Sequence, residues 1–186
     1  DKRDKIDFDE FTYRAAIRQD ITDDLNVYAS YNRGFKSGLW ALQSPTGDAV
    51  GPQTTDAYEI GLKSELFNNM LRLNLAGFHY KIDDYQIRAA PVATNPILLN
   101  AATAKIDGVE AEFQLAPARG LLITGNLNWL KAKFDDFPGA VYTYPRPAAP
   151  CDPNRGSNPS QTIGPPTGGN ATCIGDASGN RIPLAP

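Results

Sequence analysis

YEIGLKSEL, residues Tyr58–Leu66, alternates between apolar and charged side chains. One parity carries apolar side chains, at Tyr58, Ile60, Leu62 and Leu66. The other parity carries charges, at Glu59, Lys63 and Glu65. Because successive side chains of a strand point to opposite faces of its sheet, this period of two predicts a β-strand with one apolar and one polar face.

Two later stretches, Val109–Leu115 and Leu121–Trp129, repeat the pattern. Their apolar parity holds Val109, Ala111, Phe113, Leu115, Leu121, Ile123, Leu127 and Trp129. Their polar parity holds Glu110, Glu112, Gln114, Thr124, Asn126 and Asn128. We therefore expect a sheet with one apolar side and one hydrated side.

The region between Phe8 and Asp136 divides into six predicted strands. The other three are Phe8–Gln19, Leu25–Lys36 and Leu71 to about Arg88. In the last of these, Leu75 and Phe78 are apolar on opposite parities, so we expect a β-bulge near Gly77 to restore the phase.

The connections alternate between short and long. Thr22–Asp24, Phe67–Met70 and Ala116–Gly120 are short and rich in turn-forming residues, whereas Ser37–Thr55, Ala89–Asn100 and the stretch from Phe137 onward are long. An antiparallel up-and-down meander places all the short turns at one end. Outer-membrane β-barrels have this asymmetry, so the predicted fold class is all-β, part of a larger transmembrane barrel.

Composition excludes several classes. The net charge of −3 argues against a nucleic-acid partner, which needs a basic surface. No run of about 18 apolar residues is present, which excludes transmembrane helices but not strands. The one histidine, His79, is expected to be a wall residue, and we predict no catalytic site, metal site or cofactor.

Both cysteines, Cys151 and Cys173, lie in one stretch rich in proline, glycine and asparagine. Such a pair predicts a disulfide in an oxidising compartment, worth about 3 kcal/mol through loop closure. We therefore expect residues 137–186 to form a long surface loop tethered by this bridge.

A family resemblance rests on three stretches: YASYNRGFKSG (Tyr28–Gly38), DAYEIGLKSELFNNMLRLNLAGFHYKIDDYQ (Asp56–Gln86) and NAATAKIDGVEAEF (Asn100–Phe113). They resemble consecutive barrel strands of TonB-dependent outer-membrane receptors. The resemblance implies a barrel of about 22 strands around an N-terminal plug, which imports a scarce ligand such as a siderophore, cobalamin or a sugar. Residues 1–136 would be an internal piece of that barrel with periplasmic turns, and residues 137–186 an extracellular loop.

The resemblance also implies partners and sites. The expected partners are outer-membrane lipid, the transported ligand and the energising TonB complex, reached through a plug that this chain lacks. Glu59, Lys63, Glu65, Glu110 and Glu112 would face the lumen. Phe35, Trp40 and Trp129 would lie at the membrane interface, and Tyr142, Tyr144 and Arg146 would contact ligand.

Two alternatives remain open from the residues. One is a passive porin or barrel adhesin, since nothing in the strands themselves requires a plug. The other is a soluble β-sheet carbohydrate-binding module in which Trp40 and Trp129 stack on sugar rings.

Overall fold

The computed structural model describes residues 7–40, 49–92, 95–138, 140–145 and 170–182. The regular elements of these residues are strands: β1 (Tyr13–Thr22), β2 (Leu25–Lys36), β3 (Leu39–Trp40), β4 (Ala49–Val50), β5 (Gln53–Leu66), β6 (Leu71–Val92), β7 (Asn95–Ala118), β8 (Leu121–Asp136), β9 (Ala140–Pro145) and β10 (Asn170–Gly175). No helix in the described part of the chain is long and apolar enough to cross a bilayer.

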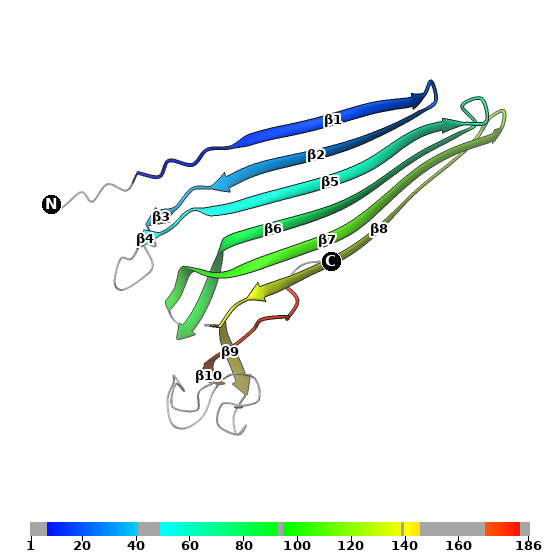
Figure 1. Cartoon of the computed structure of the whole chain (residues 1–186). Helices are drawn as coiled ribbons and strands as arrows, with labels where there is room; N and C mark the ends of the chain where they lie inside the picture. Colours follow the sequence, from blue (N-terminus) through cyan, green and yellow to red (C-terminus); the bar gives the residue numbers. More distant parts are fainter. Residues whose placement is uncertain (1–6, 41–48, 93–94, 139, 146–169, 183–186) are drawn as a thin grey trace.

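Six long strands form one antiparallel sheet in the order β1-β2-β5-β6-β7-β8. The three short turns between paired strands lie together at one end of this sheet (Figure 1). The β3–β4 pair, the β6–β7 connection and the β9–β10 ribbon lie at the other end. The predicted antiparallel meander and the sorting of its short turns are confirmed.

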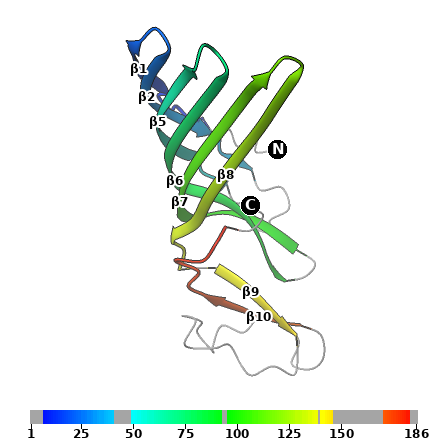
Figure 2. The ribbon, with the colours of Figure 1, turned by 90° about the vertical axis from the view of Figure 1, so that its right-hand side faces the viewer.

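The sheet is a single twisted layer, which Figure 2 shows from the side. Its register aligns the apolar parities of neighbouring strands, so that Ile60 of β5 lies opposite Ala29 on one side and Gly77 on the other. The side chains of Ile17, Ile60 and Leu127 are 71%, 66% and 71% exposed. We call this side, which carries the apolar parity of every long strand, the apolar face, and its reverse the polar face.

The buried core is small and lies at the end opposite the short turns. It gathers Ile82, Ala102, Ala104, Ala132, Phe134, Phe137, Ala140, Ala177 and Ile182. After β10 the chain returns to the free edge of β8, where Arg181 forms an antiparallel bridge with Lys133. The amide of Ile182 donates to the carbonyl of Ala132 at 3.2 Å.

This return of the chain is held at its base by one turn. Ser178 donates its hydroxyl and its amide to Asp176 Oδ1 at 2.5 and 2.8 Å, and these bonds hold the pKa of the Asp176 carboxyl below its usual value. The Ser178 hydroxyl also accepts the amide of Phe137 at 2.9 Å. Hydrogen bonds thus join the two ends of the connection between β8 and Arg181, at Phe137 and at Ser178.

Three aromatic rings lie over glycines directly opposite them in the register. The pairs are Tyr28 with Gly61, Phe78 with Gly108, and Phe113 with Gly125. A Cβ on Gly108 would meet the Phe78 ring at 2.3 Å. Glycine therefore leaves the space that the opposing ring fills, a known way to cover a strand glycine.

The strand predictions need three corrections. β1 begins at Tyr13 and ends at Thr22, not at Phe8 and Gln19. The bulge expected near Gly77 is wrong, because β6 pairs with β5 and β7 without a shift there. The irregularity lies between Ile82 and Tyr85, where Asp84 has a positive φ of 55°.

The third correction concerns Ala89–Asn100, predicted as a long loop. Both strands instead continue through it as a hairpin that pairs Gln86 with Asn100 and Val92 with Asn95. Short strands also occur inside the other two long connections, as β3 with β4 and β9 with β10.

Candidate functional site

The polar face carries all five charged residues that the sequence predicted to face a lumen. Lys63 lies in one register row with Asn74, Glu112 and Asn126. The next row on the same face holds Gly61, Ala76, Glu110 and Asn128. Glu59 and Glu65 flank Gly61 and Lys63 on β5 with the same parity. The structure therefore brings these charges together on one side of β5 and β7.

Hydrogen bonds tie this set to residues that the sequence reasoning did not single out. The Tyr28 hydroxyl donates to Glu59 Oε1 at 2.7 Å, and Lys63 Nζ lies 5.9 Å from the centre of the Tyr28 ring. Asn74 Nδ2 donates to Glu112 Oε2 at 3.3 Å. Tyr28 has the polar parity of its strand, and this was the available signal for it.

These side chains border a hollow of about 570 Å³ on the sheet. It lies over β2, β5, β6, β7 and β8, and its polar lining includes Tyr28, Lys63, Asn74, Glu110, Glu112, Thr124, Asn126 and Asn128. Carboxylates and amides accept or donate hydrogen bonds, so this surface suits a hydrated solute or another polar protein surface. Among the described residues, no cluster of metal-ligating side chains is found.

Glu65 has a different partner. Arg72 Nη2 lies 2.7 Å from its Oε1, across the β5–β6 pair near the short turn. Glu65 thus belongs to an exposed ion pair at the end of the hairpin, away from the hollow.

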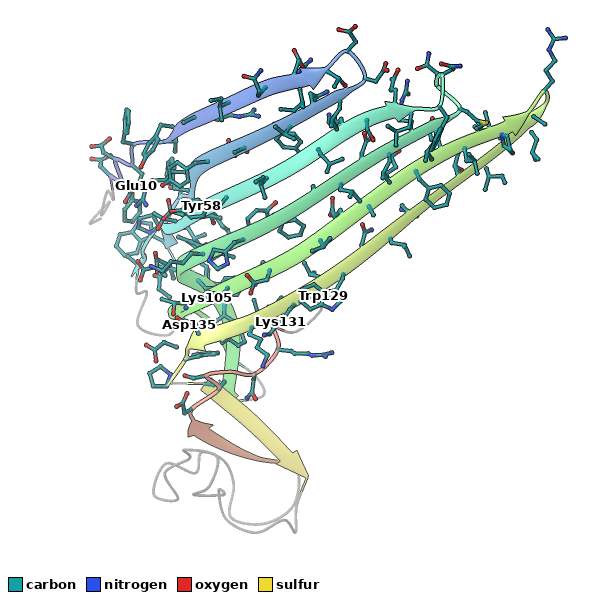
Figure 3. All side chains as sticks on the ribbon, turned by 45° about the vertical axis from the view of Figure 1, so that its right-hand side comes forward. Glu10, Tyr58, Lys105, Trp129, Lys131 and Asp135 are labelled. Atoms are coloured by element: carbon teal, nitrogen blue, oxygen red, sulfur yellow. The ribbon has the colours of Figure 1, made fainter. Side chains whose placement is uncertain are left out.

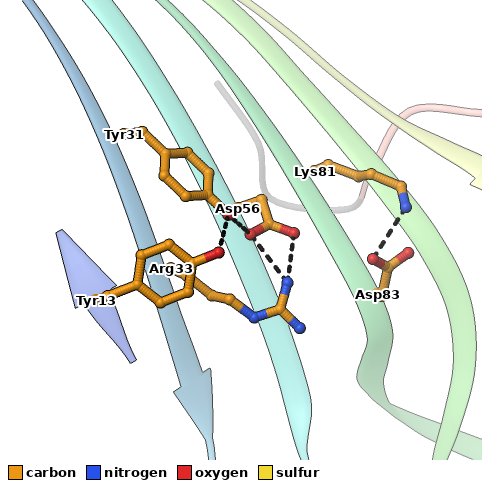
Figure 4. A network of polar contacts seen from close by, with 6 residues as sticks. All are labelled: Tyr13, Tyr31, Arg33, Asp56, Lys81 and Asp83. Atoms are coloured by element: carbon orange, nitrogen blue, oxygen red, sulfur yellow. Dashed lines mark hydrogen bonds and ion pairs between the residues drawn. The ribbon is translucent and has the colours of Figure 1, made fainter. Parts of the chain in front are cut away.

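At the other end of the sheet, Arg33 and Asp56 form an ion pair in which one guanidinium nitrogen contacts both carboxylate oxygens (Figure 4). Arg33 Nη1 lies 2.9 and 3.1 Å from the two carboxylate oxygens, and the Tyr31 hydroxyl donates to the same carboxylate at 2.5 Å. Tyr13 Oη lies 3.2 Å from Tyr31 Oη. Arg33 therefore joins β2 to β5.

Aromatic rings follow one another across the strands at this level of the apolar face. Tyr13, Tyr31, Tyr58 and His79 lie with successive ring centres 5.5, 4.8 and 6.3 Å apart. His79 Nδ1 lies 2.7 Å from Asp107 Oδ1 on β7. These rings border the apolar residues along β2, β5 and β6. The sequence placed Tyr58 on the apolar parity but predicted no row of rings across the strands.

The residues predicted at a membrane interface occupy different places. Phe35 is exposed near the end of β2, and Trp129 is exposed on the apolar face opposite Val109. Trp40 is half-buried in β3, opposite Ala49. Their contact with a membrane stays a prediction.

The residues predicted to contact ligand are Tyr142, Tyr144 and Arg146. Tyr142 and Tyr144 lie on β9, opposite Cys173 and Ala171 of β10. Their side chains, like all of Arg146, are outside the described residues. Cys151 is outside them as well, so the disulfide with Cys173 stays a prediction without support from the structure.

The family model described as TonB dependent receptor-like, beta-barrel, matches residues 1–182. Among solved structures, the ferric yersiniabactin uptake receptor FyuA from Yersinia pestis is similar at 24% identity and a TM-score of 0.54, over 65% of this chain and 18% of that one. BauA, the ferric preacinetobactin receptor from Acinetobacter baumannii, is similar at 23% identity and a TM-score of 0.51, over 73% of this chain and 21% of that one.

A third structure, of FpvAI in complex with pyocin S2, is similar at 24% identity and a TM-score of 0.51, over 66% of this chain and 18% of that one. The chain therefore spans about a fifth of the length of these structures. At such identities the likeness concerns the fold.

Proposed function

The chain belongs to the TonB-dependent receptor-like β-barrel family, and from this premise we propose that it forms part of the wall of an outer-membrane receptor that imports a scarce nutrient. The family is one of transport receptors. Residues 1–136 would supply wall strands with periplasmic turns, and residues 137–186 an extracellular loop.

The observation that carries this proposal is the contrast between the two faces of one sheet. Large apolar side chains such as Ile60 and Leu127 are exposed on one face, while Glu110, Glu112 and Asn126 border the hollow on the other. In water such an apolar face is unfavourable, at about 25 cal/mol per Å². Against hydrocarbon it is the expected exterior of a barrel whose interior is polar.

The polar face would then line the transport path. Its carboxylates and amides can bind water, a polar solute or the surface of a plug without the cost of burying charge in hydrocarbon. We infer that Glu59, Lys63, Glu110 and Glu112 contact the plug or the passing ligand. Glu65, already paired with Arg72, would act mainly in the wall.

A siderophore is the favoured class of ligand. FyuA is described as the ferric yersiniabactin uptake receptor and BauA as the ferric preacinetobactin receptor, and cobalamin or a sugar-like ligand is the alternative within the family. Tyr142, Tyr144 and Arg146 would meet the ligand at the outer end, where aromatic and cationic groups suit an anionic, ring-containing molecule. Energy would come from the TonB complex through the plug.

Uptake by the complete receptor tests this proposal. The receptor is expressed in a strain without other siderophore receptors, and the entry of radiolabelled ferric siderophore is measured with and without a functional TonB complex. We expect entry only when the complex is functional. Entry that is independent of the complex would favour the passive porin instead.

A second arm tests the polar face. Glu110→Ala with Glu112→Ala should slow uptake while surface binding of the siderophore stays unchanged, because these carboxylates lie on the wall and not in the outer loops. Gln114→Ala, on the same strand and face, serves as the control. Unchanged uptake in the double variant would remove the role assigned to the two carboxylates.

A further inference from the structure

A second hollow, of about 430 Å³, lies on the polar face beside the free edge of β1. Its polar lining consists of Arg14, Arg18, Tyr28, Ser30, Asn32 and Glu59. Arg14 of β1 lies directly opposite Asn32 of β2. Both residues lie toward the end of the sheet opposite the short turns, which we call the outer end. This hollow differs from the first in having two arginines along one side.

The guanidinium of Arg14 has no acidic partner among the described side chains. Arg18, on the same strand and face, is held by Asp20, whose Oδ1 accepts from its Nε and Nη2 at 3.1 and 2.9 Å. Glu59 accepts the Tyr28 hydroxyl at 2.7 Å. Glu59 lies two strands and one residue pair from Arg14, about 12 Å by strand spacing and rise. The hollow therefore contains one cation without a charge to balance it nearby.

Arg14 and Asn32 lie in a recess, because their neighbours on the polar face are small. Ala57 of β5 lies opposite Asn32. Gly34 is the next residue outward on this face of β2, and nothing lies within 4 Å of a Cβ built there. Asn32 Nδ2 donates to Ser30 Oγ over a long 3.5 Å, so the amide can turn toward a bound group. The recess thus offers a guanidinium and an amide as hydrogen-bond donors.

The level of Arg14 along the wall is marked by the rings of the apolar face. Ala15, its neighbour on that face, lies opposite Tyr31, and Tyr31 lies opposite Tyr58. Figure 3 shows Tyr58 near the outer end of the sheet. Under the proposed function these rings lie in the outer headgroup region. A solute that enters from outside would then pass Arg14 before it reaches Glu110.

The charges of the polar face are divided between its strands. The free cation Arg14 is on β1, whereas β5 and β7 carry Glu59, Lys63, Glu65, Glu110 and Glu112. An anionic group would be repelled by the four acids and attracted to Arg14. A planar carboxylate matches the fork of a guanidinium and accepts two parallel N–H bonds from it. One unbalanced cation also matches the single negative charge of a carboxylate better than the double charge of a phosphate.

We propose that Arg14 and Asn32 bind a carboxylate of the imported solute, and that this contact selects solutes with a free carboxylate over neutral ones. This inference rests on the proposed function, because it requires the polar face to line the transport path. Two N–H groups of Arg14 would donate to the two carboxylate oxygens, and Asn32 Nδ2 would donate to one of them. The small side chains of Ala57 and Gly34 leave the space for it.

Binding of two matched iron complexes tests this selectivity. The complete receptor, in a mild non-ionic detergent, is titrated with ferric desferrioxamine B whose terminal amine is either succinylated or acetylated, and tryptophan fluorescence reports binding. The iron-binding groups are the same, but only the succinyl complex carries a carboxylate. We expect it to bind at least about tenfold more tightly, as is typical of hydrogen bonds to a charged group. Arg14→Gln should abolish this difference, and Arg14→Lys, which keeps the charge without the fork, should retain part of it.

Arg72→Gln is the matched control. It removes an arginine of the same face that already has a partner, Glu65 at 2.7 Å, near the short turns, so the preference should persist. A second arm does not depend on the iron complex. Phenylglyoxal modifies accessible guanidinium groups, and mass spectrometry reports the modification of Arg14. Citrate should slow this modification, whereas triethyl citrate, its neutral ester, should not.

Equal binding of the two complexes by the unaltered receptor would overturn the carboxylate site. If neither complex binds, equal modification of Arg14 in citrate and in its ester would overturn it. An equal loss of both complexes in Arg14→Gln would overturn it in favour of a carboxylate of the plug, and loss of the preference in Arg72→Gln would make the effect one of overall charge. Failure of the proposed function looks different, because iron would then enter cells without a functional TonB complex, whichever iron complex is supplied.

Discussion

At the scale of single residues, the Phe78 ring requires that the residue opposite it, Gly108, has no side chain. The ring occupies the place where a Cβ on Gly108 would stand, with 2.3 Å between that Cβ and Cζ. The ring also stacks on Tyr80, with centres 4.9 Å apart, so it cannot move away without losing that contact. Gly34 on β2 differs, because nothing lies within 4 Å of a Cβ built there.

We therefore predict that Gly108→Val lowers the free energy of unfolding by about 1–3 kcal/mol, the usual cost of overpacking. Gly34→Val, the same change in open space, should cost much less. Urea unfolding of the complete receptor in detergent, followed by tryptophan fluorescence, measures both. Equal losses in the two variants would show that the ring over Gly108 does not set the cost.

Arg33 and Asp56 provide a second contrast between residues. Their side chains are 32% and 14% exposed, and the Tyr31 hydroxyl bonds to the same carboxylate. We predict that Asp56→Ala costs about 1–3 kcal/mol, as expected when a partly buried charge loses its partner. Asp20→Ala, which breaks the exposed Arg18–Asp20 pair, should cost at most about 1 kcal/mol. The same unfolding assay compares them, and a larger loss for Asp20→Ala would contradict the ranking.

At the scale of elements, β6 and β7 do more than extend the wall. Opposite each other in register, Gln86 and Asn100 reach the chain on either side of the β3–β4 pair. Gln86 Nε2 donates to the carbonyls of Ser37 and Gly51 at 3.0 and 2.8 Å, and Asn100 Oδ1 accepts the Gly51 amide at 2.6 Å. These two amides hold the β2–β5 connection at both of its ends.

We predict that Asn100→Ala speeds hydrogen exchange of the Gly51 amide by at least about tenfold, because the variant loses the bond that this amide donates, worth roughly 1.4 kcal/mol, and also the bonds from Asn100 Nδ2 to the carbonyls of Gly51 and Asp84. Asn128→Ala, an exposed amide on β8, is the control. Mass spectrometry of peptides that contain Gly51 reports the rate. An unchanged rate in Asn100→Ala would mean that the connection is held by other contacts.

An element can be predicted from the sequence when its pattern lies within the element itself, and not when it depends on pairing with a distant segment. Alternation predicts β2 and the central parts of β5 to β8, because the period of two is visible within each strand. The outer half of the β6–β7 hairpin escaped prediction because Pro91 and Pro96 interrupt its pattern. Proline is tolerated there because the pairing is irregular between Ala89 and Val92.

The polar face is predictable for the same reason, and its details are not. Parity places Glu59, Glu110 and Glu112 on one side, but the hydrogen bond from Tyr28 depends on the register between β2 and β5. The β9–β10 ribbon depends on pairing across a long interval, from Thr143 to Thr172. The run of β-favouring residues from Val141 to Tyr144 was a local signal for one of its strands.

At the scale of the whole molecule, the sheet is open and its apolar face is exposed. β1 and β8 present edges along most of their length, and unpaired edge strands and apolar surfaces both promote association in water. We predict that the 186-residue chain stays monomeric only with detergent, as measured by analytical ultracentrifugation. A soluble carbohydrate-binding module would remain monomeric in buffer, and that outcome would contradict the barrel assignment.

The orientation of the faces is tested in the complete receptor. A lipid-soluble photoactivatable probe should label the side chains of Ile60 and Leu127, on the apolar face, and leave Glu59 and Glu112, on the polar face, unlabelled. Ile60 and Glu59 are neighbours on β5 and differ only in parity, so this strand provides its own control. Preferential labelling of the glutamates would reverse the assignment of the two faces and with it the transport path.

Backbone hydrogen bonds hold the chain against β8 on both sides of the stretch between Phe137 and Ala177. This stretch can therefore be replaced as a unit. Its two ends meet at one hydrogen bond, from the Ala177 amide to the Phe137 carbonyl at 2.8 Å, so a graft of different length would meet the same anchor points. Under the proposed function, selection for a different ligand would change this stretch while the wall strands keep their register.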